Sequence, residues 1–235
     1  MDKRRLAYEL RRYICAQTNR EPPSQPVYAG ERETEGEVNL QQTEDKISPG
    51  NSEELDRLAV EISDCMDCRL SENRTNVVFG EGDVGARVMV VGEGPGANED
   101  EQGLPFVGRS GKLLRQGFEK VGLSGEDIYI TNVVKCRPPD NRDPRTDELK
   151  ACRPYLDQQL ELIDPAVILS LGNFALGYFL GEDGGIMDAR GETYDFEGYT
   201  VVPTFHPSYM LYNPGETKTK QFLSDLKLAV SQLNG

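Results

Sequence analysis

The chain has 235 residues, of which 37% are hydrophobic, and it carries a formal net charge of −14 at pH 7. It contains no apolar run near the roughly 18 residues that a membrane-spanning helix needs, and no apolar stretch of a signal peptide follows its charged start. We therefore expect a cytoplasmic protein with no membrane partner. The acidity lowers the expectation of nucleic-acid binding without excluding it, because a basic patch can be local.

The first part of the chain is predicted to lie outside the folded domain. Residues 3–17 have the apolar spacing of a short amphipathic helix, whose basic face either touches DNA or simply docks as a terminal helix. Residues 18–51 are polar and rich in Glu, Pro, Gly and Gln, which is typical of a disordered linker. The predicted domains are thus an N-terminal segment, 1–51, and a folded domain, 52–235.

From Ser52, a predicted N-cap of a helix that runs to about Asp64, strands and helices alternate. The predicted strands are Arg87–Gly92, Ile128–Val134, Ala166–Leu171 and Thr200–Phe205, and further helices lie near 110–121, 145–163, 173–180 and 218–233. This alternation predicts the α/β class: a three-layer α/β/α sandwich with a central, mainly parallel four-stranded sheet. Ligands of such sheets bind beyond the carboxyl ends of the strands, so we expect the functional residues there.

Four cysteines have a spacing that suggests a shared site. Cys65-x-x-Cys68 is followed far downstream by Cys136 and Cys152, while Cys15 receives no role. Disulfides are rare in a reducing compartment, so metal binding or plain burial is expected instead. Four sulfur ligands suit zinc or an iron–sulfur cluster, and the spacing does not separate these two. Four unrelated buried thiols are the remaining alternative.

A glycine-rich turn follows the first predicted strand. Gly92-x-Gly94-x-x-Ala97 formally fits the dinucleotide-binding fingerprint. However, Pro95 removes a backbone donor that a pyrophosphate requires, and no acidic residue closes a second strand about 20 residues later. A polar loop is predicted over 99–108, where the fingerprint requires a helix. The turn therefore indicates only that some ligand approaches the backbone closely.

Three side chains near strand ends are candidates for ligand recognition, each with a structural alternative. Phe106 either plugs the core or stacks on a planar ligand. Asn132 is either a structural bridge or a reader of a polar edge, because its amide complements the N3–H and O4 of uracil. His206, the only histidine, is either structural or a neutral donor to a carbonyl oxygen that gains negative charge.

In their order and spacing these stretches resemble the family 4 uracil-DNA glycosylases of archaea and bacteria, the iron–sulfur branch of the uracil-DNA glycosylase superfamily. The matching stretches are CMDC at 65–68, GEGPGANED at 92–100, LPFVGRSGKLL at 104–114, TNVVKCRPP at 131–139, Cys152 and HPSYML at 206–211. The resemblance covers about residues 55–233. It implies an enzyme that flips uracil out of single- or double-stranded DNA and hydrolyses its N-glycosidic bond, leaving an abasic site.

The resemblance also implies roles for individual residues. The implied catalytic residues are Glu93, Asn132 and His206, with Gly94, Pro95 and Phe106 completing the uracil pocket. Glu93 is expected to place a water molecule or to counter the positive charge on the sugar, and His206 to stabilise the uracil anion. The implied ligands of a structural [4Fe–4S] cluster, without a redox step, are Cys65, Cys68, Cys136 and Cys152.

The implied DNA contacts fall into two groups. One is the loop after the histidine, in which a wedge fills the vacated base stack; its residues are Ser208, Tyr209, Met210 and Leu211. The other is a set of cations expected to hold phosphates, namely Lys135, Arg137, Arg142 and Arg145. We expect a monomer whose partner is uracil-containing DNA.

Three alternatives remain. A superfamily member that binds uracil-DNA covalently is disfavoured, because residues 106–111 contain neither a basic insertion nor a histidine. A non-catalytic DNA- or nucleotide-binding module on the same fold releases no free uracil. A zinc-bound structural protein is colourless, whereas an iron–sulfur protein is brown.

Overall fold

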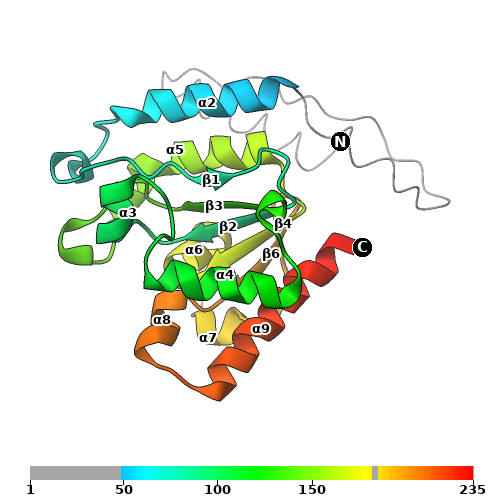
Figure 1. Cartoon of the computed structure of the whole chain (residues 1–235). Helices are drawn as coiled ribbons and strands as arrows, with labels where there is room; N and C mark the ends of the chain where they lie inside the picture. Colours follow the sequence, from blue (N-terminus) through cyan, green and yellow to red (C-terminus); the bar gives the residue numbers. More distant parts are fainter. Residues whose placement is uncertain (1–48, 182–184, 235) are drawn as a thin grey trace.

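The computed structural model describes residues 49–181 and 185–234. They form a three-layer α/β/α sandwich (Figure 1), which confirms the predicted fold class. The predicted helix over 3–17, most of the predicted linker and Cys15 lie outside the described residues. Helix α2 (Pro49–Ser63) begins before Ser52, so Ser52 is not the cap that the sequence predicted.

The sheet has six strands in the order β1-β3-β2-β4-β6-β5. Their bounds are β1 (Glu81–Gly82), β2 (Val88–Gly92), β3 (Ile128–Asn132), β4 (Val167–Leu171), β5 (Tyr194–Phe196) and β6 (Tyr199–Thr204). The four inner strands are parallel and match the predicted ones, whereas β1 and β5 pair antiparallel at the edges. The prediction of four strands missed these edges because they are only two and three residues long.

Helices cover both faces of the sheet (Figure 1). Besides α2 they are α3 (Ala97–Gln102), α4 (Arg109–Val121), α5 (Thr146–Ile163), α6 (Gly172–Leu180), α7 (Ile186–Ala189), α8 (Pro207–Tyr212) and α9 (Glu216–Ser231). On one face Val88 and Val90 pack with α4 and α9, and on the other Met89 and Val91 pack with α5 and α6. This double burial explains the continuous apolar strands. No described helix is long and apolar enough to cross a membrane.

Helix α3 replaces the first half of the polar loop predicted over 99–108, so that prediction is wrong. Its acidic residues Glu99 and Asp100 are buried. Asp100 accepts hydrogen bonds from the backbone N–H groups of Thr75 (2.9 Å) and Asn76 (3.3 Å). These tertiary contacts give the short helix partners that its sequence alone does not reveal.

Candidate functional site

The register of two parallel strands brings the glycine turn next to Asn132. Strands β2 and β3 pair with Gly92 opposite Asn132, at the carboxyl ends of both. The pairing continues past the strands, since Val133 N–H donates to the Gly92 carbonyl (3.0 Å) and Val134 N–H to that of Glu93 (3.1 Å). The turn and the amide therefore occupy one end of the sheet, as predicted for a ligand site.

Gly92 allows the Asn132 amide and the Phe106 ring to meet. A Cβ atom on Gly92 would lie 2.5 Å from Asn132 Oδ1 and 2.7 Å from Phe106 Cζ, so no other residue fits there. Asn132 Oδ1 is buried and has no hydrogen-bond partner among the described residues. Leaving such an acceptor unpaired costs about 1–3 kcal/mol. The amide is therefore poised to accept a hydrogen bond from a ligand beside the aromatic ring.

The Phe106 ring is held by a strained and tightly packed backbone. Phe106 has φ 53°, a left-handed conformation that costs a non-glycine residue about 1–2 kcal/mol. A Cβ on Gly111 would lie 1.6 Å from the Phe106 carbonyl oxygen, so the start of α4 packs directly on this backbone. Glu99 Oε1 accepts from Gly108 N–H (2.8 Å) and fixes the loop from the other side. No sequence pattern indicated this role of Glu99.

His206 lies beside Phe106 at the end of β6, where it caps α8. The two ring centroids are 5.7 Å apart. Nδ1 faces both the backbone N–H (3.3 Å) and the hydroxyl (2.6 Å) of Ser208. Because the backbone N–H can only donate, Nδ1 is the acceptor and the proton of the neutral ring lies on Nε2. Burial lowers the pKa of His206 to about 4, so the imidazole is neutral near pH 7.

Glu93 follows Gly92 in the turn and is half-buried. Burial and, to a smaller extent, the nearby Asp143 carboxylate together raise its pKa to about 7. The next residue, Gly94, is packed closely enough that a Cβ would lie 2.7 Å from Val134 Cγ2, and Pro95 is buried. The turn thus places a carboxyl group that changes its charge near neutral pH next to the Asn132 strand.

The four predicted cysteine ligands line one cavity. Cys65 follows α2, Cys68 precedes a 3₁₀ turn (Arg69–Glu72), Cys136 follows β3 and Cys152 lies on α5. All four thiols are free of disulfide bonds, as expected for a reducing compartment.

The spacing of the cysteine sulfurs bears on which kind of metal group these residues could bind. Four sulfurs on one zinc ion lie 2.3 Å from it and hence roughly 3.8 Å apart, whereas a four-iron cluster spreads its ligands more widely. Within residues 49–181 and 185–234 no three Cys, His, Asp or Glu side chains converge as they do on a single ion. The four thiols supply the donor set that zinc or an iron–sulfur cluster requires.

Hydrogen-bond donors surround these sulfurs. Arg74 Nη1 lies 3.4 Å from Cys136 Sγ, and the Tyr155 hydroxyl 3.5 Å from Cys65 Sγ. The backbone N–H of Lys135 donates to Cys152 Sγ (3.3 Å). Donors of this kind stabilise thiolates and their clusters. Sequence analysis missed Arg74 and Tyr155, because neither lies next to a cysteine in the chain.

Lys135 does not lie on the surface, so the prediction that it binds a DNA phosphate is wrong. Its side chain is fully buried. The ammonium donates to Thr131 Oγ1 (2.5 Å), to the Asn132 carbonyl (2.8 Å) and to Gln159 Oε1. The prediction for Lys135 rested on its charge alone, but the fold directs this side chain into the interior.

The loop after His206 is only partly as predicted. Met210 is 6% exposed and packs in the core, so the structure contradicts its role as an exposed wedge. Tyr209 is 38% exposed, and Leu211 is partly exposed. Tyr209 packs against Phe205, with ring centroids 5.5 Å apart. The Ser208 side chain is bonded to His206, which gives it a second role that the sequence did not indicate.

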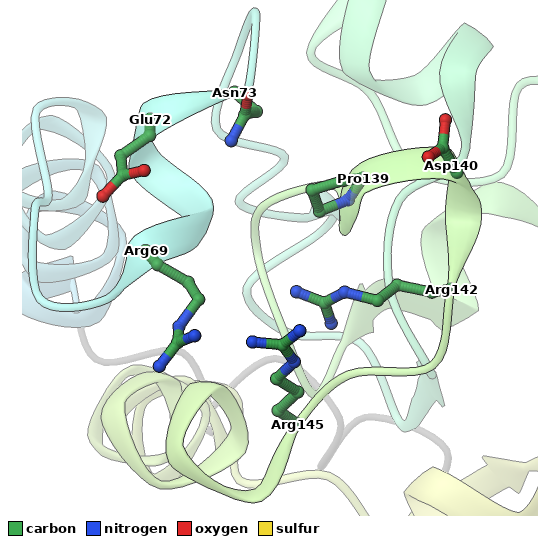
Figure 2. Close-up of a pocket in the computed structure, with 7 residues that line it drawn as sticks. All are labelled: Arg69, Glu72, Asn73, Pro139, Asp140, Arg142 and Arg145. Atoms are coloured by element: carbon green, nitrogen blue, oxygen red, sulfur yellow. The ribbon is translucent and has the colours of Figure 1, made fainter.

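A pocket of about 330 Å³ lies beside the cysteine-bearing segments; three arginines and two acidic residues, Glu72 and Asp140, line it, and we call it the basic pocket for its excess of arginine. Figure 2 shows Arg69, Arg142 and Arg145 converging on it from two sides. Glu148 holds Arg142 through two bonds of 2.6 and 2.8 Å, while Arg145 forms no ion pair within the described residues. Arg137, in contrast, donates to Asn141 Oδ1 (2.8 Å) and does not line this pocket. Arg69 was missed, although it directly follows Cys68.

Comparisons with known proteins show which family the chain resembles. The family model described as "Uracil DNA glycosylase superfamily" matches residues 79–227. A type-4 uracil-DNA glycosylase of Thermotoga maritima is 47% identical over 182 residues, which cover 76% of this chain and 95% of the relative. One of Sulfurisphaera tokodaii is 45% identical, covering 70% and 79%. A type-5 uracil-DNA glycosylase of Pyrobaculum aerophilum is 32% identical, covering 64% and 74%.

Proposed function

Because the chain belongs to the uracil DNA glycosylase superfamily, we propose that the pocket between β2, β3 and β6 binds a uracil flipped out of DNA and cleaves its N-glycosidic bond. The type-4 relatives, at 42–47% identity, make the protein a uracil-DNA glycosylase that acts in DNA repair. The observation that carries the proposed pocket is the buried, unpaired Oδ1 of Asn132 beside the Phe106 ring.

Uracil recognition rests on complementarity with this amide. Oδ1 accepts the N3–H of uracil, and the amide nitrogen donates to O4, while Phe106 stacks on the base. Cytosine presents an acceptor at N3 and a donor at N4, so the same amide meets it with two mismatched pairs. A site that hydrogen-bonds its substrate rejects an analogue lacking the match by factors of about 10⁴–10⁵.

Bond cleavage uses the neutral histidine as a donor. As the glycosidic bond breaks, negative charge develops on the base oxygen O2, and the Nε2–H of His206 donates to it. No proton needs to be supplied from solution, because the ring already holds its proton on Nε2. Glu93, as a carboxylate, places the attacking water or offsets the positive charge of the sugar.

The four cysteines are the proposed ligands of a [4Fe–4S] cluster. When bound, the cluster acts as a covalent cross-link among the end of α2, the segment after β3 and helix α5, with no electron transfer in the reaction. This role suits the donor set, four thiols of which three, Cys65, Cys136 and Cys152, have hydrogen-bond donors directed at their sulfurs.

DNA binding needs a local positive surface on an acidic protein. The proposed phosphate contacts are Arg69, Arg142 and Arg145 in the basic pocket, with Arg137 nearby. Tyr209 and Leu211 are the proposed wedge that replaces the flipped base, which repays an unstacking cost of a few kcal/mol. We expect a monomer that acts on cytoplasmic DNA, in single or double strands.

The test is release of free uracil from single-stranded and U:G duplex oligonucleotides by anaerobically purified protein. Wild type should release uracil, and Asn132→Leu should lose nearly all activity while retaining its fold and its iron and sulfide content. Folded, iron-containing wild type that binds DNA but releases no uracil would instead indicate the non-catalytic binding module.

A further inference from the structure

Lys135 presents a problem of charge balance. It is fully buried, and its three hydrogen-bond acceptors are a hydroxyl, a backbone carbonyl and an amide oxygen, none of them a carboxylate. Three acceptors around Nζ match the three donors of an ammonium group, so the geometry is that of the charged form. A buried charge without a partner of opposite sign is strongly destabilising. The lysine therefore needs an anion.

The structure offers one source of that negative charge. Among the described residues, the electrostatic partners of Lys135 are the sulfurs of Cys152 and Cys136, and no carboxylate forms an ion pair with it. Its backbone N–H also donates to Cys152 Sγ, and the residue lines the cysteine cavity. A [4Fe–4S] cluster held by four thiolates is an anion overall. Arg74 is the second cation at the cavity, but it is partly exposed, so water screens its charge.

The same ammonium reaches the uracil pocket. Nζ donates to the carbonyl oxygen of Asn132, at the last residue of β3, and the Asn132 side chain carries the unpaired acceptor. Thr131, the preceding residue, is bonded to the ammonium as well. Lys135 therefore contacts the cysteine cavity through its backbone N–H, and the backbone of the residue proposed to read uracil through its ammonium group.

We propose that Lys135 is the buried counter-ion of the cluster and a positioning residue for Asn132, so that the bound cluster holds the uracil-reading strand end in place. This inference rests on the proposed cluster. It explains why a lysine rather than an apolar residue occupies a fully buried position between the two sites.

The first test measures the reduction potential of the cluster in the intact holoprotein. A nearby buried cation favours the more negative, reduced cluster, so Lys135→Met should shift the potential to more negative values. Lys150→Met is the matched control, because this lysine is exposed on α5 and does not border the cavity. Its potential should stay at the wild-type value. A purely structural lysine predicts altered stability with an unchanged potential, and that result would overturn the proposal.

Two further measurements test retention of the cluster and the link to Asn132. Lys135→Met should lose the visible absorbance of the cluster about tenfold faster under a chelator, the usual scale for an outer-shell partner. Its affinity for free uracil should fall while that of Lys150→Met does not. Wild-type affinity in a variant with a shifted potential would limit Lys135 to the cluster and contradict the positioning role.

A second variant covers the case in which Lys135→Met does not fold. Gln159→Glu keeps the lysine and gives it a carboxylate in place of an amide that it already contacts. The charge of Lys135 is then neutralised locally, and the potential should again become more negative. Wild-type protein that contains neither iron nor sulfide would refute the proposed cluster itself. A cluster that is present but keeps its reduction potential in both variants would instead refute only the role of Lys135.

Discussion

The proposed uracil pocket and the cysteine cavity both involve β3 or the segment that follows it, yet they are assembled in different ways. The pocket is fixed by the sheet, because the register of β2 and β3 places Gly92 opposite Asn132 without any ligand. The cavity draws its cysteines from the end of α2, a 3₁₀ turn, the segment after β3 and helix α5. Of these four segments, only the one after β3 directly continues a strand of the sheet.

This difference predicts two kinds of response to substitution. The pocket keeps an unpaired acceptor and a neutral donor in a rigid frame, so changes there should alter the rate and leave stability nearly unchanged. The cavity relies on the group that it holds, so changes there should first alter cluster retention and the segments around it. The predictions below test this division.

The largest expected effect is on catalysis, at His206. Replacing it by alanine removes the Nε2–H donor, and losing one such donor lowers kcat by about 10²–10³-fold, or about 2.7–4 kcal/mol. Ser208→Ala is the matched control, because its backbone N–H still fixes the Nδ1 side of the ring. Single-turnover uracil release and urea denaturation should show a large loss of rate with little loss of stability. Near-normal turnover by His206→Ala contradicts its assignment.

The next effect is a pH dependence that comes from Glu93. Its raised pKa, about 7, means that the carboxylate forms as the pH rises through neutrality. Activity should therefore fall roughly tenfold for each pH unit below 7, because protonation of a single group follows that slope. His206, with a pKa of about 4, stays neutral across this range, so its titration does not change the rate there.

Two variants separate Glu93 from other titrating groups. Glu93→Gln should be slower at pH 8 and nearly independent of pH between 5 and 8, a range that spans the pKa of about 7. Asp143→Asn removes the second cause of the raised pKa, so its profile should shift to lower pH. A wild-type rate that instead rises as the pH falls from 8 to 5 would mean that a protonated group carries the reaction.

Much of the pocket was predictable from sequence, because strand ends are local features. Valine-rich runs marked β2 and β6, and the residues just after them, Glu93 and His206, were expected at one edge of the sheet. The neutral tautomer of His206 was harder to foresee, since it depends on the Ser208 backbone. The role of Glu99 depends on a contact with Gly108 that forms only in the fold.

The errors arose where a residue's environment is set by distant segments. Lys135 follows an apolar strand and lies two residues before Arg137, and its charge suggested a surface position, but Gln159 of α5 covers it. Met210 lies in a loop motif, yet the one-turn helix α8 directs it into the core. Sequence patterns assign Lys135 and Met210 to a segment, but they do not show whether each side chain faces the core or the solvent.

A smaller effect on stability is expected at Gly172, which directly follows β4 and packs against His206. Its φ is +79°, and a Cβ there would lie 2.9 Å from His206 Cβ. Gly172→Ala should lower the free energy of unfolding by about 1–2 kcal/mol from the left-handed backbone and displace the histidine as well. Gly177→Ala, in the same helix with open space around it, should instead stabilise by about 0.5–1 kcal/mol. Urea denaturation and uracil release check both. Equal stability changes in the two variants contradict this role of Gly172.

The smallest expected effect is at Arg145, on the cavity side of the molecule. The pocket that it lines is bordered by the turn after Cys68 and by the segment between Cys136 and Cys152. Arg145→Ala should weaken binding to DNA with or without uracil by a similar factor, and reduce the slope of log affinity against log salt by about 1, as expected for one lost phosphate contact. Lys150→Ala, on the same helix but outside the pocket, is the control. A loss confined to uracil-containing DNA would place Arg145 in base recognition and break the division between the two regions.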